Sequence, residues 1–185
     1  MHFAAGKWTT DQIPLDRLIG NAVVVDVSAA GAANADYQVS VTDFTRWEAT
    51  HGAIEPDTIV LIRTDFAKRW PNARSYWGTD EKGAGAVAQL HFPGLHPDAA
   101  RRLVEKRVRA VGLDTASIDY GQSMLFESHR ILYERNIPAF ENLAALDTLP
   151  ARGATVYALP MKIKGGSGGP PRAIASVPAD ASATR

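Results

Sequence analysis

The sequence predicts a single α/β domain with a mixed sheet, because strand-like apolar runs alternate with amphipathic helical segments along its 185 residues. The β-branched runs at 22–27 and 58–63 are continuous rather than alternating, which is typical of strands buried on both faces. The segment 97–108 opens with a proline and carries apolar residues at helical spacing. A chain of this length can bury a substantial core within one domain.

The other elements follow the same alternation. A helix over 41–51 is expected to start from Ser40 or Thr42 and to end against Gly52, with Phe44 and Trp47 on one face. A later apolar run extends from 155 to 163, and a strand is expected near 154–159. Pro160 is expected to break the run or to place the strand at an edge. Shorter segments complete the pattern: strands at 110–113 and 173–177, and a helix at 128–136.

Three segments lack this periodicity. Residues 66–93 hold several aromatic side chains and read as a long loop that is either functional or mobile. The glycine-rich segment 164–171 lies between expected strands, so it reads as a tight loop rather than a linker. The domain is therefore expected to span 1–177, and the small polar tail 178–185 is expected to be disordered.

The overall composition excludes several classes of function. Lys plus Arg and Asp plus Glu both total 20, which gives no electrostatic preference for nucleic acid or anionic membranes. There is no cysteine, so a metal would have to be held by His, Asp and Glu, a ligand set that suits Zn, Mn or Fe. No apolar run is long enough to span a bilayer, and the first residues lack the features of a signal peptide, so a cytoplasmic location is expected.

The glycine-rich loop does not match two familiar catalytic motifs. No Gly-Lys-Ser/Thr follows residues 164–169, so they do not form a P-loop. The letters Gly165-Gly166-Ser167-Gly168-Gly169 fit a nucleophile elbow, but Pro170 and Pro171 lead into a strand rather than a helix. A metal-independent serine hydrolase is therefore the weakest interpretation.

Histidines are the remaining candidates for chemistry. His51, His91 and His96 lie at helix ends or in surface segments, where structural roles are favoured. His129 opens a helix and Glu141 follows the next short strand, 12 positions later, so folding can bring the two together. Two ligands cannot close a metal site, and on residue chemistry alone a core histidine and a surface glutamate are favoured.

Several of these segments together resemble the cyclase family, which includes bacterial kynurenine formamidases (arylformamidases) and isatin hydrolases. The segments are 112–119, His129-Arg130, Glu141-Asn142-Leu143, the N-terminal residues 7–15 and the glycine-rich residues 164–168. The resemblance implies an α/β fold of the swivelling β/β/α type. It also implies metal-dependent hydrolysis of an aryl formamide such as N-formylkynurenine, a step of tryptophan catabolism via kynurenine. An isatin-hydrolase-like opening of a cyclic amide is the alternative.

The family motif His-x-Gly-Thr-His-x-Asp-x-Pro-x-His implies roles for individual residues. Met1-His2-Phe3 matches its last histidine, so His2 corresponds to the catalytic acid/base, and the other metal ligands are expected upstream of residue 1. His129 and Glu141 match the family's remaining metal ligands. A zinc or manganese ion is therefore expected to bind weakly or not at all, and a homodimer or higher oligomer is implied.

The substrate site is expected to lie beside the same residues. Backbone groups of the glycine-rich loop at Gly166 and Ser167 are expected to support a substrate carbonyl. Trp8 is expected to contribute to an apolar wall, together with Phe66, Trp70 and Trp77, and core or dimer packing is the alternative role for these side chains. A non-catalytic binding or assembly subunit is the other interpretation left open.

Overall fold

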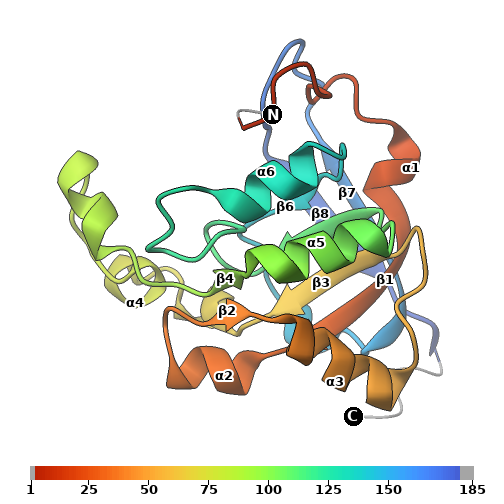
Figure 1. The fold of residues 1–185 in the computed structure, drawn as a ribbon, viewed down its shortest axis with the longest axis horizontal. Coiled ribbons are helices and arrows are strands. Elements are labelled where there is room, and N and C mark those ends of the chain that lie inside the picture. Colours follow the sequence, from red (N-terminus) through yellow and green to blue (C-terminus); the bar gives the residue numbers. More distant parts are fainter. Residues whose placement is uncertain (1–2, 180–185) are drawn as a thin grey trace.

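A six-stranded mixed sheet organises the computed structural model, which describes residues 3–179 (Figure 1). The strand order is β6-β5-β3-β1-β7-β8. The strands are β1 (Ile19–Asp26), β3 (Ile59–Arg63), β5 (Ala110–Leu113), β6 (Ala139–Phe140), β7 (Arg152–Pro160) and β8 (Pro171–Ser176). The first four in spatial order run parallel, whereas β7 and β8 are antiparallel to their neighbours. The expected α/β fold with a mixed sheet is confirmed.

The longer helices lie over one face of this sheet, in front of it in Figure 1. They are α3 (Val41–His51), α5 (Pro97–Glu105) and α6 (Glu127–Tyr133). Smaller elements complete this part of the fold: α1 (Leu15–Leu18), α2 (Ser28–Ala33), η3 (Leu146–Thr148), and the two-stranded sheet of β2 (Gln38–Val39) and β4 (Gly94–Leu95). No helix in residues 3–179 is long and apolar enough to cross a membrane.

Strand β1 is buried on both of its faces, as its continuous apolar run predicts. Val23 and Val25 pack with the side chains of the covering helices. Ala22 and Val24 belong to a second cluster on the opposite face, which includes Leu146. Because both faces are covered by apolar side chains, polar groups are confined to the ends of the central strands.

A backbone carbonyl next to a bulge in β1 accepts a hydrogen bond from a tryptophan side chain. The pairing register with β7 shifts between Ala22 and Val23. The indole Nε1–H of Trp47 donates to the carbonyl of Val24 over 2.8 Å. This bond gives the displaced backbone carbonyl a partner inside the core, and it fixes α3 on the sheet.

Several helix and strand ends differ from the sequence expectation. Ser40 and Asp43 form the capping box that starts α3, as expected. Helix α5 ends at Glu105 rather than near 108, because Arg107 takes a left-handed conformation (φ 57°). Strand β7 ends at Pro160, which pairs with Pro171 next to the loop that connects the two strands, so the residues beyond it are not strand.

Residues 66–93 form a folded arm that stands away from the sheet, at the left of Figure 1. It contains η1 (Phe66–Arg69), α4 (Ala73–Trp77) and η2 (Ala84–Gln89), where the sequence predicts an aperiodic loop. Its base is held by a buried cluster of Phe66, Tyr76 and Phe92. The periodicity is missing because these turns are too short to present a helical stripe.

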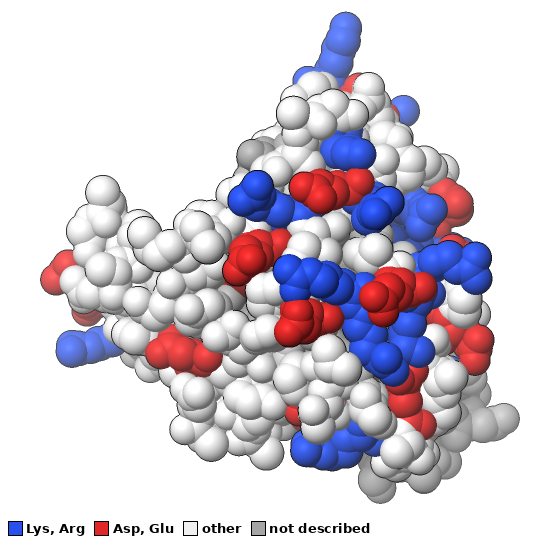
Figure 2. Space-filling model, in the orientation of Figure 1, with Lys and Arg blue, Asp and Glu red and all other residues white. Residues whose placement is uncertain are grey.

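A partly buried ion-pair network joins α3 to the end of α5, and charges of both signs intermingle on the surface there (Figure 2). The carboxylate of Glu48 accepts hydrogen bonds from Arg102 (2.8 Å), Lys106 (2.6 Å) and the backbone N–H of Ile54 (2.8 Å). Burial would raise the pKa of Glu48, but these bonds outweigh it and lower the pKa to about 2. The carboxylate therefore stabilises the fold above its ordinary pKa, and this contribution is lost as the pH falls from about 4.5 through about 2.

Replacing Glu48 with Gln is expected to lower the free energy of unfolding by about 2–3 kcal/mol at pH 7. The difference from wild type should shrink as the pH falls below about 4, because the wild-type carboxylate then gains a proton. Urea unfolding at pH 7 and pH 3 measures both values. Glu105→Gln, at an exposed position of α5, serves as the matched control. An equal difference at the two pH values would show that the charge of Glu48 is not the source.

Candidate functional site

Asp119 and His129 form the buried centre of the candidate site. Asp119 lies in the loop after β5, and its Oδ2 is 2.5 Å from Nδ1 of His129. The same carboxylate accepts the backbone N–H groups of Ser128 (3.0 Å) and His129 (3.2 Å). It therefore caps the first turn of α6 and fixes the imidazole ring in one orientation.

Glu141 lies on the other side of the imidazole ring. It follows β6, and its Oε1 is 3.2 Å from Nε2 of His129. The same oxygen accepts the backbone N–H of Ile118 over 3.0 Å. The side chain of His129 is 4% exposed, whereas that of Glu141 is 32% exposed. Glu141 thus connects the buried histidine with the surface.

The two carboxylates set the protonation of the residues between them. Burial would lower the pKa of His129, but its hydrogen bonds to Asp119 and Glu141 outweigh this effect and raise the pKa. Burial also raises the pKa of Tyr133, and the charges of Glu141 and Asp119 act in the same direction. Without a bound cation, the arrangement therefore favours an imidazolium between two carboxylates and a neutral phenol beside it.

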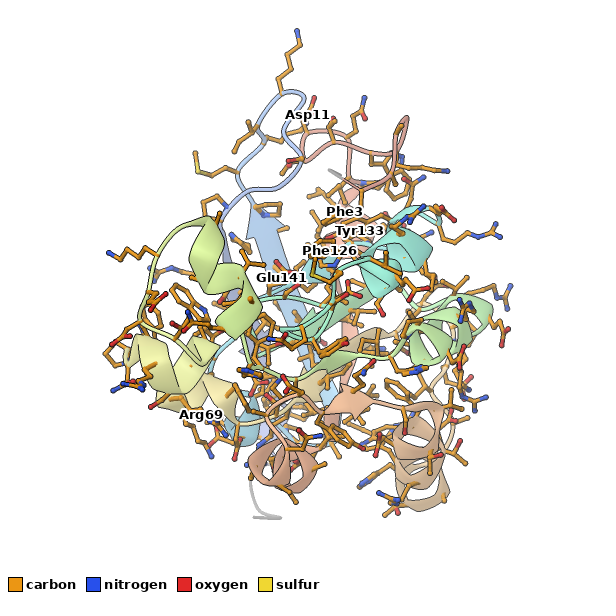
Figure 3. The ribbon with its side chains drawn as sticks, turned by 60° about the vertical axis from the view of Figure 1, so that its left-hand side comes forward. Phe3, Asp11, Arg69, Phe126, Tyr133 and Glu141 are labelled. Atoms are coloured by element: carbon orange, nitrogen blue, oxygen red, sulfur yellow. The ribbon has the colours of Figure 1, made fainter. Side chains whose placement is uncertain are left out.

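Aromatic rings surround the imidazole of His129. Phe3 lies 4.7 Å from it and is stacked on Phe126, with 4.8 Å between the ring centroids. Tyr133 meets the imidazole edge-on at 5.4 Å. Figure 3 shows Phe3, Phe126, Tyr133 and Glu141 gathered at one place. The side chain of His129 is only 4% exposed among these rings, and its electrostatic interactions are stronger there than in water.

A cavity of about 280 Å³ adjoins Glu141. Trp8 and Ser167, both expected at the substrate site, line it together with Tyr133. His129 itself is buried next to this wall. The structure therefore brings together residues from the N-terminal segment, the end of β6 and the glycine-rich loop, as the resemblance implies.

The N-terminal segment holds the glycine-rich loop in place, at the top of Figure 3 where Asp11 is labelled. The carbonyl of Gly166 accepts two hydrogen bonds from Thr10, one from its backbone N–H over 2.8 Å and one from its side-chain hydroxyl over 2.9 Å. The N–H of Gly166 donates to Ile163, and that of Gly165 to Oδ1 of Asp11. The backbone groups of Gly166 are thus already engaged, and Ser167, rather than Gly166, faces the cavity.

His129 and Glu141 fit two positions of a metal shell. Ligands that each lie roughly 2.0–2.2 Å from one zinc ion stand about 3–3.5 Å apart, and Nε2 and Oε1 are separated by 3.2 Å. The carboxylate of Asp119 on Nδ1 is the outer partner that metal-bound histidines usually have. Residues 3–179 contain no group of three or more His, Asp or Glu side chains that could hold a metal. His2, the expected catalytic residue, lies outside the described residues.

Sequence reasoning missed three residues of the site. Asp119 belongs to the segment that carries the resemblance, but its contact with His129 depends on how the loop after β5 folds. Asn142 and Tyr76 are joined by a 2.8 Å hydrogen bond across 66 positions of sequence. The only signal for Tyr76 is the aromatic content of the arm, and that content does not indicate a partner.

Comparisons with known proteins show the family to which this chain is related. The Cyclase family model matches residues 1–120. The isatin hydrolase of Roseibium aggregatum is 36% identical over 96% of this chain and 68% of its own length. The kynurenine formamidase of Paracidovorax citrulli is 30% identical over 97% of this chain and 73% of its own length.

A solved structure agrees as well. Isatin hydrolase A from Labrenzia aggregata superposes with a TM-score of 0.84 at 35% identity, covering 94% of this chain and 66% of that chain. The present chain thus spans about two thirds of the length of these relatives. From the family match, the identity with these hydrolases and the shared fold, it follows that the chain belongs to the Cyclase family.

Proposed function

We propose that this chain is a metal-dependent hydrolase of an amide attached to an aromatic ring, with a cyclic amide of the isatin type as the preferred substrate. The observation that carries the proposal is the row Asp119–His129–Glu141, which ends at the wall of a cavity lined by Trp8. The similarity to an isatin hydrolase supports the choice of substrate. N-formylkynurenine is the second candidate, because kynurenine formamidases are also similar to this chain.

Each member of the row has a distinct task in this proposal. Asp119 holds Nδ1 of His129, which leaves Nε2 as the atom that binds a cation together with Oε1 of Glu141. A divalent metal held there supplies a Lewis acid and a bound water of lowered pKa. Trp8 and Tyr133 give the cavity an aromatic wall against which a planar substrate can pack.

Hydrolysis of isatin is expected to depend on a divalent metal such as Mn²⁺ or Zn²⁺, because the ion would supply the Lewis acid and the activated water. His129→Ala and Glu141→Gln should each reduce the metal-stimulated rate by about 100-fold or more. A spectrophotometric assay with isatin and with N-formylkynurenine, with and without a chelator, measures these rates.

His91→Ala is the matched control, since His91 pairs with Asp36 outside the site. A rate that is insensitive to the chelator and to both site variants would contradict the proposed function. A higher rate with N-formylkynurenine than with isatin would retain the hydrolase and reverse the order of the two substrates.

Asp119→Asn is expected to weaken metal binding by about 10- to 100-fold, because the outer carboxylate that orients the ligand is lost. It should also lower the free energy of unfolding by about 1–2 kcal/mol, because the cap of α6 is impaired. Metal titration and thermal unfolding measure the two effects. Glu127→Gln, at an exposed position in the first turn of the same helix, is the control. Unchanged metal affinity in Asp119→Asn would show that Asp119 has only a capping role.

A further inference from the structure

A second cavity, of about 320 Å³, lies between the arm and the loop that follows Glu141. On the arm side it is lined by Trp70, Tyr76 and Trp77, and on the loop side by Asn142, Leu143 and Ala144. None of the residues that line it in the described chain is charged. Its volume is near the lower end of the roughly 300–1,000 Å³ of typical ligand pockets, which suits one small ring system.

The three aromatic rings of the arm form one cluster. Tyr76 meets Trp70 edge-on at 5.8 Å and lies 6.0 Å from Trp77, and the two tryptophans are 6.1 Å apart. Trp70 remains 59% exposed. Tyr76 is buried beneath it and Trp77 is half-buried, so Trp70 is the ring best suited to hold another planar ring by stacking or edge contacts.

Asn142 supplies the polar edge of this cavity. The Tyr76 hydroxyl donates to its Oδ1 over 2.8 Å. Because Oδ1 is taken by this bond, the Nδ2 amide group is the part of the side chain turned away from Tyr76. Asn142 is exposed, and no acceptor for Nδ2 is found within residues 3–179. The hydroxyl of Tyr76 thus orients a free hydrogen-bond donor.

Asn142 also connects this cavity with the candidate site. It lines both the aromatic cavity and the 280 Å³ cavity, whose wall includes Glu141. Its left-handed backbone (φ 56°) and the bond from its N–H to the carbonyl of Thr115 (2.8 Å) hold it at this junction. Asn142 is therefore the residue that the two cavities share.

We propose that the arm cavity is a recognition site for a neutral planar bicyclic ring that carries a carbonyl, with the Tyr76-oriented amide of Asn142 donating to that carbonyl. The site rests on the proposed function in one respect: the ring belongs to the substrate class proposed there. It is held here in a cavity separate from the one beside Glu141, and the two cavities share Asn142. The uncharged lining favours a neutral ring over a charged one. A ring without an acceptor leaves the Asn142 amide unpaired and is bound less tightly.

The test compares isatin, which has two carbonyls, with indole, which has the same ring size and none. Calorimetric titration in the presence of a chelator measures binding without turnover. Wild type is expected to bind isatin about tenfold more tightly than indole. Asn142→Asp removes the donor and tolerates the left-handed backbone, so it should abolish this preference. Tyr76→Phe should weaken isatin binding about threefold, because the carboxamide is no longer fixed.

Two matched variants and a second substitution keep the result interpretable. Asn21→Asp, at an exposed position of β1, and Tyr157→Phe, in β7, should leave the preference for isatin unchanged. Asn142→Gly removes the amide without adding a charge, and it should reduce isatin affinity about fivefold with little effect on indole. Thermal unfolding confirms that each variant is folded.

The outcomes separate this inference from the proposed function. Selective binding of isatin without metal-stimulated hydrolysis would contradict the proposed function and leave the recognition site standing. Hydrolysis that continues with an unchanged KM in both Asn142 variants would overturn the recognition site alone. Equal losses of isatin and indole binding in these variants would also overturn it, because the amide would then not select the carbonyl.

Discussion

Burial of the parallel strands on both faces is the constraint from which the arrangement of the molecule follows. Strands β1, β3 and β5 carry apolar side chains on both faces, so they leave no place for a polar side chain along most of their length. Functional groups must then come from the segments that follow the strands. Asp119 follows β5 and Glu141 follows β6, and because these strands are parallel neighbours, both segments lie at one edge of the sheet.

The same constraint explains how much of the fold could be predicted. Continuous β-branched runs identified β1 and β3 within a few residues, and the capping residues located the start of α3. Helix α2 (sequence SAAGAA) was missed because alanine and glycine produce no amphipathic stripe. The turns of the arm were missed because each depends on tertiary contacts, such as the burial of Tyr76, rather than on local periodicity.

The candidate site was less accessible to sequence reasoning. The spacing of His129 and Glu141 allowed a contact, but residue chemistry alone favoured separate structural roles, and the resemblance was needed to join them. Asp119 and Asn142 gain their roles from side-chain hydrogen bonds that form only in the folded chain. The expected homodimer and the role of His2 stay predictions. The expected cytoplasmic location also stays a prediction.

The hydrogen bonds that join the N-terminal segment to the glycine-rich loop have a consequence for folding. Thr10 and Gly166 are 156 positions apart, and Asp11 and Gly165 are 154 apart. Closing a chain segment of this length costs about 4–5 kcal/mol of entropy, so such contacts form after the local ones. The wall of the cavity beside Glu141 is therefore expected to be among the last parts of the molecule to assemble. It is also expected to open before the sheet does, so a ligand bound there would slow this local opening.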